Sequence, residues 1–204
     1  MGKDTTSKLF SVSLVMTNFV SNTSYTMPKR ILLIGGPSTG KTTVINHLQS
    51  LEYTCFVEIS REVIKKAQAD GIDQLFLEKP LLFSQLLKGA RIRQYEEADT
   101  FEHEFVFYDR GIPDTVAYMD YIGQDYPEEF MDACKKYRYD HVFMLAPWKK
   151  IHKTDNERYE SFEQAQKIHE ELLKTYKKYN YHPVEVPQDE VSARSQFILN
   201  KLSS

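Results

Sequence analysis

Residues 35–42 read Gly-Gly-Pro-Ser-Thr-Gly-Lys-Thr and match the pattern G-x-x-x-x-G-K-[ST] at every fixed position. This pattern forms a phosphate-binding loop (P-loop), because its glycines let backbone N–H groups turn around a phosphate. The helix that follows then directs its positive N-terminal end at the anion. We therefore expect nine residues to bind the phosphates of a nucleotide: Gly35, Gly36, Pro37, Ser38, Thr39, Gly40, Lys41, Thr42 and Thr43.

The sequence on both sides of this loop fits the motif. Arg30–Ile34 is a short apolar run that ends at glycines, as expected for a buried parallel strand. After the loop, residues 42–51 carry apolar side chains at helical spacing. In this context Lys41 is expected to reach the β- and γ-phosphates, and the Thr42 hydroxyl to ligate Mg²⁺.

Strands and helices alternate along the rest of the chain. Strands are expected at 53–57, 105–108, 141–145 and 183–186, and helices at 60–69, 80–100 and 162–179. The last helix starts with a capping box formed by Ser161 and Gln164. The 80–100 helix carries Leu82, Leu86, Leu87 and Ala90 on one face. This alternation predicts an α/β fold with a parallel sheet between helices.

Length and composition predict one domain. The chain has 204 residues, and its 26 basic and 29 acidic residues argue against a protein that coats nucleic acid. No stretch approaches the roughly 18 apolar residues that a membrane span needs, and two cysteines are too few for a disulfide framework.

Residues 1–28 are rich in Ser, Thr and Asn and are expected to form a loose tail or a targeting segment before a domain at 29–204. We expect a cytoplasmic protein.

A second nucleotide-related motif follows the third strand. Residues 105–110 read Phe-Val-Phe-Tyr-Asp-Arg, and four apolar residues before an acid are typical of the strand whose carboxylate lies beside Mg²⁺. Asp109 is therefore predicted to contact the metal ion. Hydrolytic motors usually carry a second acid next, whereas this chain has Arg110, which is suited to phosphoryl oxygens. This favours a bound acceptor over water, although the pair could simply cap a strand.

Four motifs in this order resemble the ribosylnicotinamide-kinase-like P-loop family, often called AAA-family ATPases. They are the P-loop, Val57-Glu-Ile-Ser-Arg-Glu62, Asp109-Arg-Gly-Ile-Pro-Asp114, and Pro147-Trp148 with Asp155-Asn-Glu-Arg158. The resemblance covers roughly residues 29–202. It implies a nucleoside/nucleotide-kinase-like three-layer sandwich with a five-stranded parallel sheet and a basic lid. It also implies ATP and Mg²⁺ as cofactors and a small molecule as phosphoryl acceptor.

The resemblance suggests roles for two further residues. Glu58 follows the second strand, where the carboxyl ends of strands line the ligand crevice, and it resembles the base that accepts a proton from the substrate hydroxyl. A solvent-facing acid or a partner of Arg61 is the alternative. Arg158 lies in the expected lid at 148–158, whose cations would close over the donor phosphates. An ordinary solvated loop is the alternative there.

Three other charged residues are open to two interpretations each. Asp114 is expected to be the N-cap of a helix at 115–122 in preference to a substrate contact. Arg91 and Arg93 lie on the 80–100 helix, where they either grip an acidic substrate or remain on the surface.

The sequence thus leaves two functional hypotheses. The first is a kinase that moves the γ-phosphoryl group of ATP to a nucleoside-like or other metabolite. The second is an NTPase or nucleotide-switched regulatory module without a small-molecule acceptor. A nucleic-acid-end kinase is disfavoured by the acidic charge balance. The guanine-reading pattern Asn-Lys-x-Asp is missing from the sequence, which favours ATP over GTP.

Overall fold

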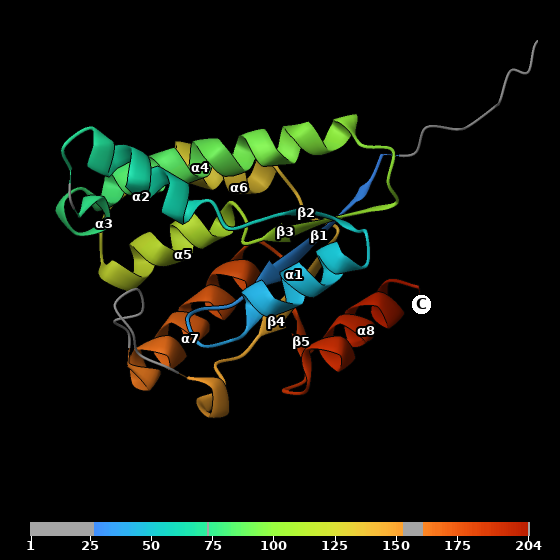
Figure 1. Ribbon diagram of the computed structural model, residues 1–204. Coiled ribbons are helices and arrows are strands. Elements are labelled where there is room, and N and C mark those ends of the chain that lie inside the picture. Colours follow the sequence, from blue (N-terminus) through green and yellow to red (C-terminus); the bar gives the residue numbers. More distant parts are fainter. Residues whose placement is uncertain (1–26, 73, 153–160, 204) are drawn as a thin grey trace, which may run out of the picture.

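The fold is organised around a parallel β-sheet (Figure 1). The computed structural model describes residues 27–72, 74–152 and 161–203. Its five strands are β1 (Lys29–Ile34), β2 (Thr54–Phe56), β3 (Phe105–Asp109), β4 (His141–Leu145) and β5 (Val184–Val186). They lie in the order β2-β3-β1-β4-β5, and every neighbouring pair is parallel. Each predicted strand is present; β4 has the predicted bounds, and no end of the other strands differs by more than one residue.

Helices cover both faces of the sheet, as Figure 1 shows. One face packs against α1 (Lys41–Ser50) and α8 (Val191–Leu202) through Ile31 and Leu33 of β1. The other face packs through Leu32 and Ile34 against a layer that contains α4 (Pro80–Glu97), α5 (Pro113–Ile122), α6 (Glu129–Lys136) and α7 (Phe162–Lys178). Because successive side chains of a strand point to opposite faces, both sides of β1 are buried. The predicted three-layer sandwich is confirmed.

Shorter elements complete the layer beside α4. Helices α2 (Ser60–Ala69) and α3 (Leu75–Glu78) pack there in a separate apolar cluster, and η1 (Ala98–Thr100) extends the end of α4. The short helix η2 (Lys149–Ile151) follows β4. No helix within the described ranges has the length and apolar character needed to cross a bilayer.

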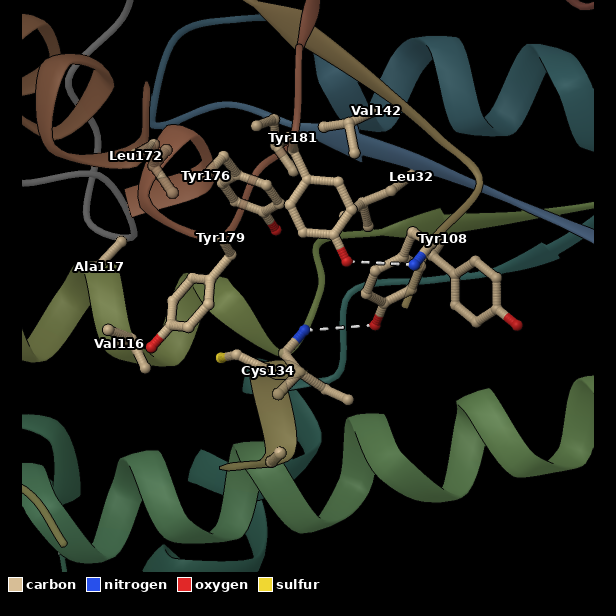
Figure 2. Packing of buried hydrophobic residues seen from close by; sticks show 14 of the residues in the cluster. Leu32, Tyr108, Val116, Ala117, Cys134, Val142, Leu172, Tyr176, Tyr179 and Tyr181 are labelled. Carbon is tan, nitrogen blue, oxygen red and sulfur yellow. Dashed lines mark hydrogen bonds between the residues drawn. The ribbon is translucent and has the colours of Figure 1, made fainter. Parts of the chain in front are cut away.

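Buried tyrosines connect the loop after β3 to the start of β4 (Figure 2). The Tyr139 hydroxyl accepts a hydrogen bond from the Ile112 N–H at 3.3 Å, and the Tyr181 hydroxyl accepts one from the Tyr139 N–H at 3.1 Å. These hydrogen bonds reduce the cost of burying the two hydroxyls together with their large rings. The chain that follows Asp109 is thereby held in a fixed position.

Two predicted details of helices had different outcomes. The capping box is confirmed, because the Ser161 hydroxyl accepts from the Gln164 N–H and the Gln164 side chain accepts from the Ser161 N–H. Of the four apolar residues on one face of the 80–100 helix, Leu87 and Ala90 are buried, whereas Leu82 and Leu86 are 37% and 44% exposed. The buried residues of this helix include Phe83, Leu87, Ala90 and Arg91, and the buried Arg91 has polar partners in the Gly111 carbonyl and Glu58. The predicted tail, apart from Met27 and Pro28, lies outside the described residues.

Candidate active site

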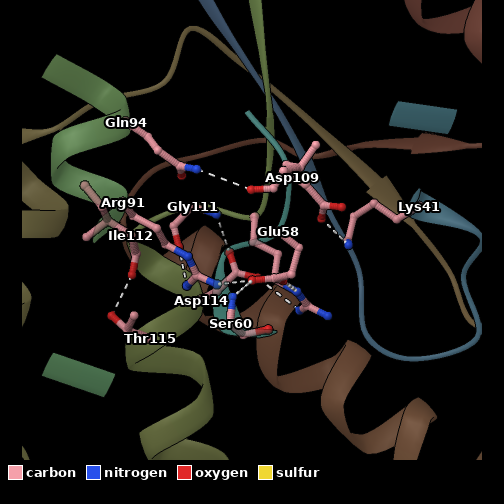
Figure 3. A network of polar contacts seen from close by, with 12 residues as sticks. Lys41, Glu58, Ser60, Arg91, Gln94, Asp109, Gly111, Ile112, Asp114 and Thr115 are labelled. Carbon is pink, nitrogen blue, oxygen red and sulfur yellow. Dashed lines mark hydrogen bonds and ion pairs between the residues drawn. The ribbon is translucent and has the colours of Figure 1, made fainter. Parts of the chain in front are cut away.

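Three sequence motifs meet at one edge of the sheet. Strand β1 lies between β3 and β4 in the sheet. The chain that leaves β1 enters α1 on one face of the sheet, whereas the chain that leaves β3 enters α5 on the other face. In open α/β sheets ligands bind at such a point, outside the carboxyl ends of the strands. The P-loop follows β1, Glu58 follows β2, and Asp109 ends β3. Figure 3 shows residues from all three segments gathered at this edge.

The P-loop has the backbone conformation of an anion-binding turn. Ser38 and Gly40 have φ values of +59° and +70°, both in the left-handed region. Residues that enter this region within a turn form a concave nest of N–H groups that binds anions. The loop also passes very close to β4, since a Cβ atom on Gly35 would lie 2.6 Å from the Leu145 carbonyl oxygen. A side chain at Gly35 would therefore displace the loop.

Four carbonyl groups of the P-loop accept hydrogen bonds, two from residues of the loop itself and two from distant parts of the chain. The acceptors and donors are Gly36 O from Thr39 Oγ1 (3.1 Å), Ser38 O from the Trp148 N–H (2.9 Å), Thr39 O from Arg194 Nη1 (3.0 Å), and Gly40 O from Thr43 Oγ1 (2.6 Å). The Ser38 hydroxyl is also 2.6 Å from Nδ1 of His152. Three of these partners, Trp148, His152 and Arg194, lie more than a hundred positions further along the chain than the loop residues that they contact.

Lys41 and Asp109 form a buried ion pair between the start of α1 and the end of β3 (Figure 3). Their side chains are 5% and 1% exposed. A buried charge is tolerated when it is paired, so each residue supplies the counter-charge of the other. The residue predicted to contact the phosphates thus lies beside the residue predicted to contact the metal ion.

The oxygen donors near this pair fit a magnesium ion that arrives with a nucleotide. Mg²⁺ is commonly held by one or two protein oxygens together with substrate phosphates and water. The buried Asp109 carboxylate and the hydroxyl of Thr42, an exposed residue in the first turn of α1, are donors of this kind. Within the described ranges, no three His, Cys, Asp or Glu residues are grouped as they would be in an all-protein metal cage.

Glu58, Arg91, Arg110 and Asp114 form a second group of charges, which we call the charge cluster (Figure 3). Glu58 pairs with Nε of Arg110, and its other oxygen is 3.5 Å from Nη2 of Arg91. The Ser60 N–H donates a hydrogen bond to Glu58 at 3.1 Å. Burial alone would raise the pKa of Glu58, but the charges of Arg110 and Arg91 outweigh it and lower the pKa to about 2. Glu58 is therefore a carboxylate held between two guanidinium groups, just after β2 at the carboxyl edge of the sheet.

Arg110 is held in an uncommon backbone conformation. Its φ is +74°, which few residues other than glycine adopt, and its N–H donates to the Leu33 carbonyl at 3.0 Å. The guanidinium lies between Glu58 and Asp114, with Nη1 at 3.5 Å from Asp114 Oδ1. Burial would lower the pKa of Arg110, but these carboxylates raise it instead. A fixed cation next to the P-loop is the result.

The predicted N-cap role of Asp114 is wrong. Helix α5 begins at Pro113, because the fixed φ of proline suits the first turn of a helix, and Asp114 lies inside that turn. Its buried carboxylate accepts hydrogen bonds from the Gly111 N–H at 3.0 Å and from the Tyr176 hydroxyl at 2.5 Å. Asp114 thus belongs to the charge cluster that holds Arg110.

The two arginines of α4 have different environments. Arg91 is 3% exposed, donates to the Gly111 carbonyl at 2.9 Å and contacts Glu58. Arg93 is exposed on the surface. One turn after Arg91, Gln94 donates to the Val57 carbonyl at 3.3 Å and so holds the segment before Glu58. Gln94 lies three residues after Arg91 on the same helix, and this spacing could have identified Gln94 from the sequence.

The predicted lid is only partly within the described residues. Lys149 and Lys150 are exposed in η2, and Arg158 lies outside the described residues.

The sequence did not identify Trp148 and Arg194 as supports of the P-loop, or Tyr176 as a partner of Asp114. The sequence gives no sign of a polar role for Tyr176, because it is one of the buried residues on the packed face of α7.

A parallel sheet with a P-loop after β1 and an Asp-Arg pair at the end of β3 defines a P-loop protein of the nucleoside/nucleotide-kinase-like fold. Residues 30–194 match the model of a family described as AAA domain, and the chain belongs to this family. The predicted family and the predicted fold class are both confirmed.

Solved structures with this fold include enzymes that bind nucleosides and nucleotides. A deoxyadenosine kinase from M. mycoides has a TM-score of 0.65 at 18% identity, with 85% of this chain and 98% of that chain covered. A NadR protein in complex with NR has a TM-score of 0.63 at 20% identity, covering 86% of this chain and 49% of that chain. A thymidylate kinase from Candida albicans has a TM-score of 0.62 at 16% identity, covering 87% and 92%. No match was found among curated protein sequences.

Proposed function

We propose that this protein is a small-molecule kinase that transfers the γ-phosphoryl group of ATP to a hydroxyl group of a nucleoside-like or other metabolite. The observation that carries the proposal is the position of Glu58. An ionised carboxylate, held between two guanidinium groups, lies at the same sheet edge as the P-loop. Structures with this fold include kinases that act on a nucleoside or a nucleotide, which supports the same class of reaction.

On the donor side, the P-loop would bind the nucleotide phosphates. Lys41 would exchange part of its contact with Asp109 for the β- and γ-phosphate oxygens. Thr42 and Asp109 would hold Mg²⁺, which supplies positive charge to the phosphate oxygens when it is bound. The buried position of Lys41 and Asp109 keeps water away from these charges and strengthens their action.

On the acceptor side, Glu58 would accept a hydrogen bond from the acceptor hydroxyl and orient its oxygen toward the γ-phosphorus. A P–O bond to the acceptor forms, the P–O bond to the ADP leaving group breaks, and the hydroxyl proton passes to Glu58 and then to solvent. A carboxylate with a pKa of about 2 is a weak base. Because the transition state of phosphoryl transfer is largely dissociative, orientation matters more than early proton removal. Arg110 would stabilise the charge of the transferred group.

A panel of acceptors tests this proposal. Nucleosides, nucleoside monophosphates and other hydroxyl metabolites are incubated with γ-labelled ATP and Mg²⁺, and label transfer is compared with release of free phosphate. We expect transfer to at least one acceptor above the rate of hydrolysis. Release of phosphate alone with every acceptor would favour the NTPase hypothesis.

The variant Glu58→Gln tests the proposed role of Glu58 toward the acceptor. General-base and orienting help of this kind contributes about 10²–10⁴-fold in rate, so we expect transfer to collapse while nucleotide affinity is retained. The matched control is Glu62→Gln, which removes an exposed carboxylate from the first turn of α2. If Glu58→Gln instead abolished ATP hydrolysis without any acceptor, Glu58 would be positioning water and the kinase proposal would fail.

A further inference from the structure

Arg194 is a buried arginine that the proposed reaction does not use. It lies on α8 with 4% of its surface exposed, and Nη1 donates to the Thr39 carbonyl of the P-loop at 3.0 Å. Its guanidinium carbon is 5.9 Å from the centre of the Trp148 ring. Within residues 27–72, 74–152 and 161–203, no carboxylate forms an ion pair with it. The polar contact that ties this buried cation to the rest of the protein is therefore the one with the P-loop carbonyl.

We propose that Arg194 is a positioning residue for nucleotide binding, which fixes the direction of the P-loop N–H groups. In a trans peptide unit the C=O of one residue and the N–H of the next point in opposite directions. When Arg194 holds the Thr39 carbonyl on the α8 side, the Gly40 N–H is turned to the opposite side. The Trp148 N–H holds the Ser38 carbonyl in the same way and so turns the Thr39 N–H. Two consecutive donors are thereby fixed before a phosphate binds.

The fit between Arg194 and Gly40 supports this assignment. Gly40 has φ +70°, and a Cβ atom there would lie 2.9 Å from Nη1 of Arg194 and 3.0 Å from its Nη2. It would also lie 3.0 Å from the end of the Ile151 side chain. The glycine therefore allows the left-handed turn and the close approach of the guanidinium at once. Preorganised donors of this kind bind an anion without the cost of ordering the loop.

Arg138 provides a matched control for the loss of an arginine. Its Nη1 also donates to a backbone carbonyl, that of Tyr179 at 2.7 Å, and its guanidinium carbon is 3.8 Å from the centre of the Tyr181 ring. It precedes β4, whereas the P-loop follows β1. Because these strands are parallel, the two arginines lie at opposite ends of the sheet. The variant Arg138→Met therefore removes the same kind of contacts without touching the P-loop.

The experiment is calorimetric titration of the full chain with ADP and Mg²⁺, together with melting temperatures, and it needs no acceptor. We expect Arg194→Met to weaken ADP binding about tenfold, because the loop would then have to be ordered when the nucleotide binds. Arg194→Lys, which keeps the charge and one donor, should bind with intermediate affinity. Arg138→Met should melt at a lower temperature and bind ADP within about twofold of the unmodified protein.

Two outcomes would overturn the proposal. The first is ADP affinity in Arg194→Met equal to that of the unmodified protein. The second is an equal loss of affinity in Arg138→Met, which would show that general destabilisation is responsible. Should Arg194→Met fail to fold, Arg194→Lys and the amide NMR signal of Gly40 decide instead. We expect ADP to shift this signal strongly in the unmodified protein and weakly in Arg194→Lys, and equal shifts would reject the positioning role.

Discussion

The P-loop and the charge cluster are neighbours, but different forces hold them. The P-loop presents backbone groups, and its carbonyls are fixed by Trp148 and Arg194 from distant parts of the chain. The charge cluster consists of side chains from four segments that neutralise one another, with two acids and two bases. A backbone site tolerates changes in its side chains, whereas a neutral cluster is unbalanced by the loss of any one member. The two regions should therefore respond differently to substitution.

Asp109→Asn is expected to have the largest effect, because Asp109 lies between the two regions. The change keeps the shape of the side chain and removes the charge that pairs with Lys41 and would face Mg²⁺. We expect turnover to fall by about 10³-fold, since metal-assisted charge stabilisation contributes several kcal/mol. Nucleotide affinity should fall only modestly, because the P-loop backbone is unchanged. Steady-state rates at several Mg²⁺ concentrations, combined with ADP titrations, measure both quantities.

An Asn variant with full Mg²⁺-dependent turnover would show that the metal ion is held elsewhere. Asp99→Asn is a suitable control, because it removes an acid from η1, where Asp99 pairs with Arg30. Its turnover should be close to that of the unmodified protein.

The charge cluster should also make stability depend on pH. The pKa of Glu58 falls from its usual 4.5 to about 2 in the folded protein, so its ion pairs contribute fully above about pH 4.5. This contribution is lost as the pH falls from there to about 2. We expect Glu58→Gln to be less stable than the unmodified protein at pH 7, by at most about 3 kcal/mol. The difference should shrink as the pH falls below 4.5.

Urea unfolding between pH 3 and pH 7 measures this difference. Glu62→Gln serves again as the exposed control, with an expected change within about 0.5 kcal/mol. A difference between Glu58→Gln and the unmodified protein that stays constant with pH would mean that the charge of Glu58 does not stabilise the fold. The same pKa predicts that ionisation of Glu58 places no limit on the transfer rate between pH 5 and pH 8.

The two regions also differ in how well the sequence predicts them. The P-loop is contiguous, so its residue types, its strand and its helix are all present in one stretch of sequence. The supports contributed by Trp148 and Arg194 could not be predicted, because they depend on where η2 and α8 pack. In the charge cluster, Glu58 and Arg110 come just after the ends of strands, and this position identifies them from the sequence. Asp114 was assigned to a helix cap, because local sequence favours capping and only the packing of α7 shows its other partner.

Tyr176→Phe should have the smallest effect and separates packing from charge. The change removes one hydroxyl and keeps the ring, so the buried Asp114 carboxylate loses the hydrogen bond of 2.5 Å. Loss of a hydrogen bond to a buried charged group costs about 1–3 kcal/mol of stability. Because Asp114 lies beside Arg110, we also expect transfer to fall several-fold. Nucleotide affinity should not change, since within the described residues neither Tyr176 nor Asp114 forms a hydrogen bond or an ion pair with the P-loop.

Tyr181→Phe is the matched control for this last change. Its hydroxyl is also buried and accepts a hydrogen bond, but from the Tyr139 N–H, and its ring centre lies 5.5 Å from that of Tyr176. Both variants should lose similar stability in urea unfolding, because each leaves one buried group without its partner. Only Tyr176→Phe should slow transfer. If both variants slowed transfer equally, the packing of the tyrosines would determine the transfer rate. The contact between Tyr176 and Asp114 would then have no separate role in holding Arg110.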